Sequence, residues 1–253
     1  DRPMLDLVGL GILAGVVPVY LGIAAALVLR RALPRTWEAS LIGLSTGVLT
    51  YLFFDLMHEA VELMGVRDPF SWLLFLGSLF LSFVGLVHLE KHQFLKGRHA
   101  DQALTLPFVI AAGMGLHNLG EGLAIGTSYA GGEWALSGLL VAGFALHNGT
   151  EGFGIVGAAG QSPIPPRTVV LLGLTGGAPT CIGTVLSGLI VSPYLSLVWY
   201  ALAAGSLIYV VFALVAMTYT SSRKVHMAYG VWTGIALMAM TAMFLTLVGG
   251  HRS

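Results

Sequence analysis

Eight long apolar runs, separated by short polar breaks, constrain this chain more than any other feature of its sequence. Each run is close to the roughly 20 residues that a helix needs to cross the hydrocarbon core of a bilayer. Strands of a membrane barrel would instead be about ten residues long and would alternate strictly between apolar and polar side chains. We therefore predict an all-α integral membrane protein with eight spans at about residues 6–29, 39–61, 70–90, 104–129, 134–159, 167–191, 194–220 and 226–249.

The composition also favours lipid as the solvent of this chain. Charged side chains make up 9% of the 253 residues and apolar ones 56%, with a mean hydropathy of +0.86. A soluble domain carries about 25% charged residues, so this chain has too few charges to cover a surface in water. Its twelve basic and twelve acidic side chains cancel, which gives no reason to expect nucleic acid as a partner. The breaks are too short for a second domain, and we expect one transmembrane domain over residues 1–253.

Lysine and arginine are distributed unevenly between alternate loops. Nine of the twelve lie in or beside the odd-numbered loops, and three lie at the termini or in the even-numbered loops. Cytoplasmic loops of membrane proteins are enriched in these two residues. The bias therefore predicts odd-numbered loops in the cytoplasm and both termini outside.

The string H-N-x-x-E-G occurs once in each of the fourth and fifth predicted spans. It covers His117 to Gly122 in the fourth span and His147 to Gly152 in the fifth, near the middle of each. In a helix, His and Glu four residues apart lie on one face, one turn from each other. The two spans are joined by a short break around Gly131-Gly132, so we expect antiparallel neighbours whose motifs meet at equal depth.

These motifs predict a metal site between the two spans. Acidic side chains at membrane depth are rare and usually functional, and two carboxylates facing one dication leave a local charge near zero. Imidazole nitrogen and carboxylate oxygen suit Zn²⁺, our first choice, and also Fe²⁺, Co²⁺, Ni²⁺ or Mn²⁺. Asn118 and Asn148 are expected either to offer amide oxygens at a secondary position or to hold the ligands in place. The predicted ligands are His117, Glu121, His147 and Glu151.

A second group of polar side chains lies toward the outer end of the second predicted span. Asp55, His58 and Glu59 lie about one helical turn apart there. In one interpretation cations enter at this point and are concentrated before they reach the central site. In the other, the end of the helix simply meets water. The residues alone leave both interpretations open.

At these residues the sequence resembles the ZIP family of divalent-metal transporters. The resemblance extends over essentially the whole chain, with eight spans, outer termini and the doubled motif in spans four and five. Asp55–Ala60 is similar to the family's acidic segment in the second span, and Pro179–Gly183 to its Pro-Glu-Pro-like stretch in the sixth.

The resemblance implies a fold, a location and a substrate. The fold would be a 3+2+3 arrangement of spans, and the location the inner membrane of a bacterium. The substrate would be Zn²⁺, Fe²⁺ or a related ion such as Mn²⁺, Co²⁺ or Cd²⁺, carried toward the cytoplasm by alternating access. Spans 1, 4, 5 and 6 would then move as one body against spans 2, 3, 7 and 8.

The chain departs from the family's pattern at several positions. The family often has Glu in the sixth span where this chain has Thr180, and acidic residues in the seventh where it has Ala213 and Leu214. The proline that is frequent before the motif Glu is Gly120 in one copy and Thr150 in the other. We therefore expect one metal ion per site rather than two.

Other functions stay open on the sequence. A metal-selective channel would use the same ligands, whereas an intramembrane metal-dependent hydrolase would need a string such as H-E-x-x-H, which this sequence lacks. We expect no enzymatic activity and no organic cofactor. The expected partners are metal ions and membrane lipid, with a homodimer left open.

Overall fold

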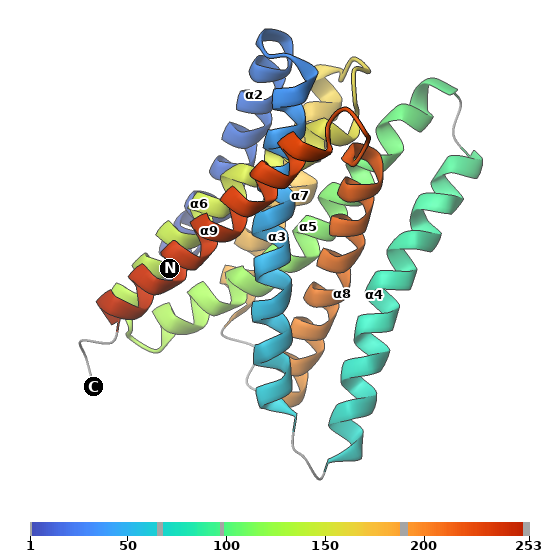
Figure 1. The fold of residues 1–253 in the computed structure, drawn as a ribbon. Helices are drawn as coiled ribbons and strands as arrows, with labels where there is room; N and C mark the ends of the chain where they lie inside the picture. Colours follow the sequence, from blue (N-terminus) through green and yellow to red (C-terminus); the bar gives the residue numbers. More distant parts are fainter. Residues whose placement is uncertain (1, 65–67, 97–98, 188–191, 250–253) are drawn as a thin grey trace.

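The computed structural model describes residues 2–64, 68–96, 99–187 and 192–249, which form helices joined by short turns and contain no strand (Figure 1). The predicted all-α architecture is confirmed. The elements are α1 (Arg2–Gly11), the π-helix η1 (Ile12–Val16), α2 (Val17–Ala32), α3 (Arg35–Leu63), α4 (Pro69–Lys96), α5 (His99–Ala130), α6 (Trp134–Ala158), α7 (Pro166–Leu186), α8 (Pro193–Thr218) and α9 (Lys224–Gly249).

These helices match the eight predicted spans, with ends that differ by a few residues. α1, η1 and α2 follow one another without a break and form the first span. Most helices continue beyond the apolar runs because polar residues also form helical turns once they lie outside the hydrocarbon core. α8 ends at Thr218, two residues before the predicted end, and residues 188–191 of the sixth predicted span lie outside the described residues.

Seven helical segments in the described part of the chain are long and apolar enough to cross a membrane, the first of them made of α1, η1 and α2. α6 has 25 residues and so is also long enough, but the polar motif His147–Glu151 at its centre lowers its hydropathy. The chain is therefore a helical bundle with the character of a multi-pass membrane protein.

The helices pack as two groups. The site half consists of α1, η1, α2, α5, α6 and α7, in which α5 packs extensively on α7 and α2 on α6. The flanking half consists of α3, α4, α8 and α9, in which α3 packs on α9 and α8, and α4 on α8. Contacts of α5 with α8 and of α3 with α6 form most of the seam between the halves. This grouping is spans 1, 4, 5 and 6 against spans 2, 3, 7 and 8, whereas the 3+2+3 division stays a prediction.

At one end of the bundle the two halves lie together, and at the other α3, α4 and α8 separate from α5 and α6. In Figure 1 the turn between α5 and α6 lies well away from the lower ends of α3, α4 and α8. At the opposite end, which carries the connection between α2 and α3, the two halves lie together. Toward the α5–α6 turn, α5 and α6 therefore diverge from α3, α4 and α8, whereas α9 stays beside α6, where Leu245 lies close to Gly143.

Glycines allow the helices of the site half to approach closely. A Cβ atom added to Gly22 on α2 or to Gly152 on α6 would overlap backbone atoms of the other helix. In lipid, helix association depends on close packing more than on a hydrophobic driving force, so small residues at a crossing are stabilising. This crossing holds α2 against the part of α6 that carries the motif.

The π-helix η1 has an identifiable cause in the sequence. Pro18 has no N–H, so the carbonyl of Ala14, four residues earlier, cannot receive its usual helical hydrogen bond. The N–H of Val17 donates instead to the carbonyl of Ile12, five residues earlier. The Ala14 oxygen is left free to accept a hydrogen bond from another helix.

Candidate metal centre

α5 and α6 bring the two motifs together because they are antiparallel neighbours, as predicted. In the tight turn between them, Gly132 has a φ angle of +79°, a left-handed conformation that glycine adopts without steric cost. The motif side chains of both helices then lie at one depth. These side chains are His117 and Glu121 on α5 and His147 and Glu151 on α6. None of the four is more than 6% exposed.

The Glu121 carboxylate is the centre of this group. Its Oε1 atom lies 3.0 Å from Nε2 of His117, one turn earlier on the same helix, and it also contacts Nε2 of His147 on α6. The candidate ligand atoms of the three residues all lie within 4.8 Å of one another. Ligands at about 2.0–2.2 Å from a shared metal ion lie within such a distance of each other. The three side chains are therefore placed to bind one divalent ion.

Glu151, the fourth predicted ligand, lies beside this group of three rather than within it. Its side chain is fully buried, and its Oε2 atom accepts a hydrogen bond of 2.9 Å from Nδ2 of Asn118. Its Oε1 atom has no hydrogen-bond partner. Since an unpartnered buried carboxylate oxygen is costly, this atom is available to a cation.

The two asparagines hold the carboxylates crosswise. Asn118 of the first motif donates to Glu151 of the second, and Asn148 of the second motif donates from Nδ2 to Oε2 of Glu121 at 3.0 Å. Each motif therefore positions the carboxylate of the other. The amide oxygens of both asparagines have no partner. Of the two roles that the sequence left open, the geometry favours holding the ligands.

Each asparagine also donates to a backbone carbonyl of a neighbouring helix, a contact that was not predicted from the sequence. Asn118 donates to Gly176 of α7 at 3.0 Å, and Asn148 to Ala14 of η1 at 2.9 Å. The Ala14 oxygen is the one that Pro18 deprives of its helical partner. A proline four residues after Ala14 was therefore the available signal for this contact, and Gly176 has no comparable one.

The buried site lacks a fixed positive charge. No lysine or arginine is among the buried residues in the described part of the chain. Two buried carboxylates without a cation are costly in a low-dielectric interior, and a bound dication would compensate both. The Nδ1 atoms of His117 and His147 also lack hydrogen-bond partners. The donor set and its charge fit a divalent transition-metal ion.

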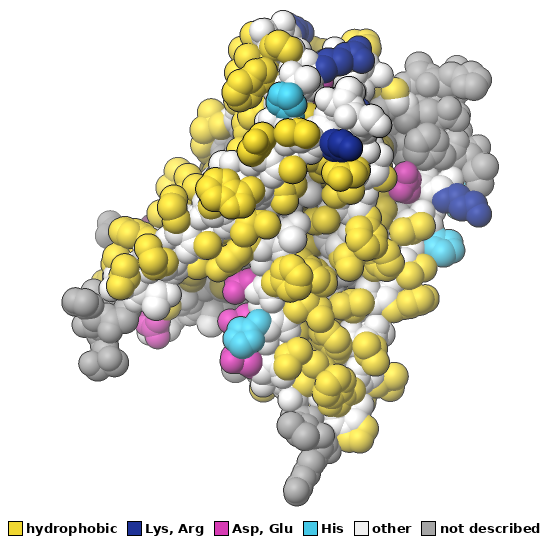
Figure 2. All heavy atoms as spheres, in the orientation of Figure 1, with side chains coloured by type: hydrophobic (Ala, Val, Ile, Leu, Met, Phe, Trp, Pro, Cys, Tyr) yellow, Lys and Arg dark blue, Asp and Glu magenta, His cyan; other side chains and the backbone are white. Residues whose placement is uncertain are grey.

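Asp55, His58 and Glu59 lie on α3 and do not join the buried group. All three are exposed, and Nε2 of His58 lies 3.3 Å from Oε1 of Glu62, one turn later. Figure 2 shows acidic and histidine side chains gathered over the lower half of α3, beside the recess between α3 and the diverging ends of α5 and α6. They lie toward the end of α3 that is opposite the α2–α3 connection, and their role as the point where cations enter stays a prediction.

Thr180, where the resembling family often has Glu, is fully buried and close to the site. Thr180 packs closely against Gly15 of η1 and Gly122 of α5, since a Cβ atom added to either glycine would overlap its atoms. The hydroxyl of Thr180 has no hydrogen-bond partner. A neutral hydroxyl adds no negative charge for a second dication. The expectation of one metal ion per site stays a prediction.

Comparisons with known proteins add no family assignment to this geometry. No model of a known protein family matches the chain, and a search of curated proteins found no similar sequence.

Proposed function

We propose that this protein transports a divalent transition-metal ion across a membrane, with Zn²⁺ as the first choice of substrate. His117, Glu121 and His147 would bind the ion, with Glu151 as a fourth ligand. The observation that carries the proposal is the Glu121 carboxylate, which is buried in a membrane-type bundle and shared by imidazoles from two antiparallel helices. The resemblance to the ZIP family agrees with the proposal, which rests on the site itself.

The burial of the site favours a carrier over an open pore. All four proposed ligands are at most 6% exposed, so an ion cannot pass them without a movement of helices. Alternating access supplies such a movement, because the site would open to one face of the membrane at a time.

The hydrogen bonds divide the bundle in the way that such a movement needs. Within the site half, Tyr20 on α2 donates to Val170 on α7. Within the flanking half, Tyr209 on α8 donates to Glu90 on α4, and Ser40 on α3 to His226 on α9. Apart from any contact of Thr105, the side-chain hydrogen bonds in the described part of the chain stay within one half, with one exception. The crossing bond joins Gln161 to Glu38.

All proposed ligands and both asparagines belong to the site half, so they would move as one body with the ion.

We propose that the ion enters past Asp55, His58 and Glu59 and leaves on the side of the odd-numbered loops, which the Lys/Arg bias assigns to the cytoplasm. Binding requires neutral imidazoles and ionised carboxylates, so it should release protons at mildly acidic pH.

Uptake by reconstituted vesicles tests this proposal. Purified protein should retain or bind zinc in elemental analysis, and its vesicles should take up Zn²⁺ with saturation, in competition with Fe²⁺, Mn²⁺ and Cd²⁺. His117→Ala combined with Glu151→Ala should reduce uptake to the level of protein-free vesicles. His92→Ala, which removes an exposed imidazole from α4, is the control and should leave uptake unchanged. Unchanged uptake in the double variant would refute the assigned site.

A further inference from the structure

We propose that Ile42 on α3, packed against Gly157 on α6, is a gate residue that closes the seam between the two halves. The gate lies at the end of the bundle that carries the α2–α3, α6–α7 and α8–α9 connections. This inference rests on the proposed function, since it concerns how a cation leaves the buried site. The argument starts from two cavities that meet at these residues.

Both cavities open at this end of the seam. The first, of about 20 Å³, lies between α2, α3 and α6, and the second, of about 240 Å³, between α3, α5, α6 and α8. Glu38, Ile42 and Gly157 line both cavities, so the two spaces meet at the contact between α3 and α6. A cation that leaves the site along this contact would reach them first.

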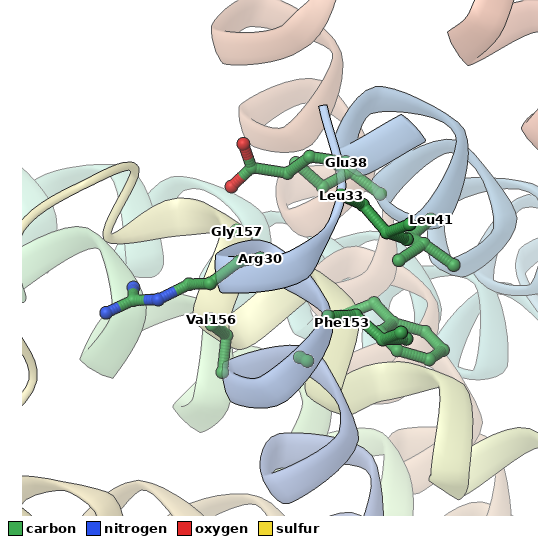
Figure 3. A pocket seen from close by; sticks show the side chains of 10 residues that line it. Arg30, Leu33, Glu38, Leu41, Phe153, Val156 and Gly157 are labelled. Carbon is green, nitrogen blue, oxygen red and sulfur yellow. The ribbon is translucent and has the colours of Figure 1, made fainter. Parts of the chain in front are cut away.

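The first cavity has an apolar interior and a charged rim. Figure 3 shows the aromatic ring of Phe153 beside Leu41, whereas Arg30 and Glu38 extend their charged ends away from these two side chains. Water and ions can therefore approach the rim, while the interior toward the site is sealed by apolar packing.

Ile42 fits against α6 because residue 157 is glycine. A Cβ atom at Gly157 would lie 2.6 Å from Cδ1 of Ile42, which is closer than real side chains pack, and 3.7 Å from Cε of Met217 on α8. Ile42 itself is 2% exposed. Ile42 and Met217 of the flanking half therefore pack against Gly157, the position of α6 that lacks a side chain.

An unpartnered polar group lies directly behind this seal. Ser45, three residues after Ile42 on α3, is fully buried, and its hydroxyl has no hydrogen-bond partner. A Cβ atom at Gly154 would lie 2.9 Å from that hydroxyl oxygen. Gly154 follows Glu151 by three residues, about one helical turn. The hydroxyl therefore lies between the metal site and the seal, where a departing cation would find a neutral oxygen.

Little besides packing holds this end closed. The hydrogen bond from Nε2 of Gln161 to Oε2 of Glu38 is long, at 3.3 Å, and exposed to solvent. Since a long, exposed hydrogen bond contributes little to stability, closure depends on the packing of Ile42. Removal of its side chain should therefore open the route to Ser45.

Thiol labelling of the full chain in vesicles tests the gate without any metal. Cys181 is the single cysteine, so Ser45→Cys in a Cys181→Ala background gives one reporter behind the seal. Ser222→Cys, in the exposed turn between α8 and α9, marks which vesicle face carries the gate. A membrane-impermeant thiol reagent should label Ser45→Cys slowly. Adding Ile42→Ala should raise the rate at least about tenfold, because it leaves a cavity in the seal.

The increase should occur for reagent applied from the Ser222 face alone. Ile23→Ala is the matched control, since it removes the same atoms from a buried position inside the site half and should change labelling by less than about twofold. No increase, an equal increase with Ile23→Ala, or an increase from the opposite face would overturn the gate. If Ile42→Ala does not yield folded protein, Ile42→Val should shift the rate in the same direction.

The labelling result and the transport result can fail independently. Faster labelling without zinc uptake would keep the gate and reject the metal substrate. Zinc uptake without faster labelling would keep the transporter and reject Ile42 as its gate.

Discussion

Two pairs of His and Glu in this molecule share a spacing but not an environment. His58 and Glu62 on α3 lie four residues apart with 3.3 Å between nitrogen and oxygen, and their side chains are 69% and 63% exposed. His117 and Glu121 on α5 have the same spacing and a distance of 3.0 Å, but their side chains are 2% and 5% exposed.

The difference shows what turns a local pair into a candidate site. An exposed ion pair contributes about 0–1 kcal/mol, because water and salt screen it and two long side chains must be held in place. The buried pair has a third partner, His147 from another helix, and an amide, Asn148, that fixes the second carboxylate oxygen. Convergence of a second helix and exclusion of water therefore matter more than spacing along one helix.

The strongest test of this comparison neutralises the carboxylate in each pair. Glu121→Gln should weaken Zn²⁺ binding by about a hundredfold or more, since loss of a partner that merely orients a ligand already costs 10–100-fold. Glu62→Gln should change the dissociation constant by less than about twofold, because that carboxylate is screened by water. Isothermal titration of both purified variants gives the two values. Similar losses in both would mean that burial does not distinguish the pairs.

The two asparagines test how much the orientation of each buried carboxylate contributes to metal binding. Asn148→Ala removes the hydrogen bond that orients Glu121 and should weaken Zn²⁺ binding about tenfold. Asn118→Ala instead releases Glu151. An equal loss in the two variants would indicate that Glu151 is a ligand, and a much smaller loss for Asn118→Ala would leave a three-residue site.

A smaller effect is expected from the π-helix beside the buried pair. Pro18→Ala restores an N–H that can compete with Asn148 for the carbonyl of Ala14. Loss of one neutral hydrogen bond predicts a dissociation constant about threefold higher. Pro107→Ala, at the proline inside α5 ten residues before His117, is the control. An unchanged affinity in Pro18→Ala would mean that Asn148 keeps its place without this anchor.

The exposed pair should affect the rate of uptake rather than equilibrium binding. His58→Ala combined with Glu62→Ala should lower the initial rate at low zinc about twofold, since nearby charge raises the local concentration of cations. The effect should vanish at about 0.5 M salt, where such fields are screened. A loss that persists at high salt would contradict electrostatic attraction as its cause.

Much of the fold could be predicted because it depends on local properties of the chain. The apolar runs predicted eight spans, and the helices match them apart from small differences at their ends. The break at Gly131-Gly132 predicted antiparallel neighbours, and the two motifs do meet. The centre differs in detail: two of the predicted ligands, His117 and His147, converge on a third, Glu121, and Glu151 lies beside these three.

The sequence by itself determined which ligand chemistry is available and on which helical face each His and Glu lies, because helical spacing is a local property. Only the tertiary structure decided that Glu121 is shared, that each asparagine holds the carboxylate of the other motif, and that His58 and Glu62 stay in contact with solvent. These outcomes depend on how α5 and α6 cross η1 and α7 and on which faces the neighbouring helices cover. Such packing is set by contacts between residues far apart in the chain, which no spacing along one helix contains.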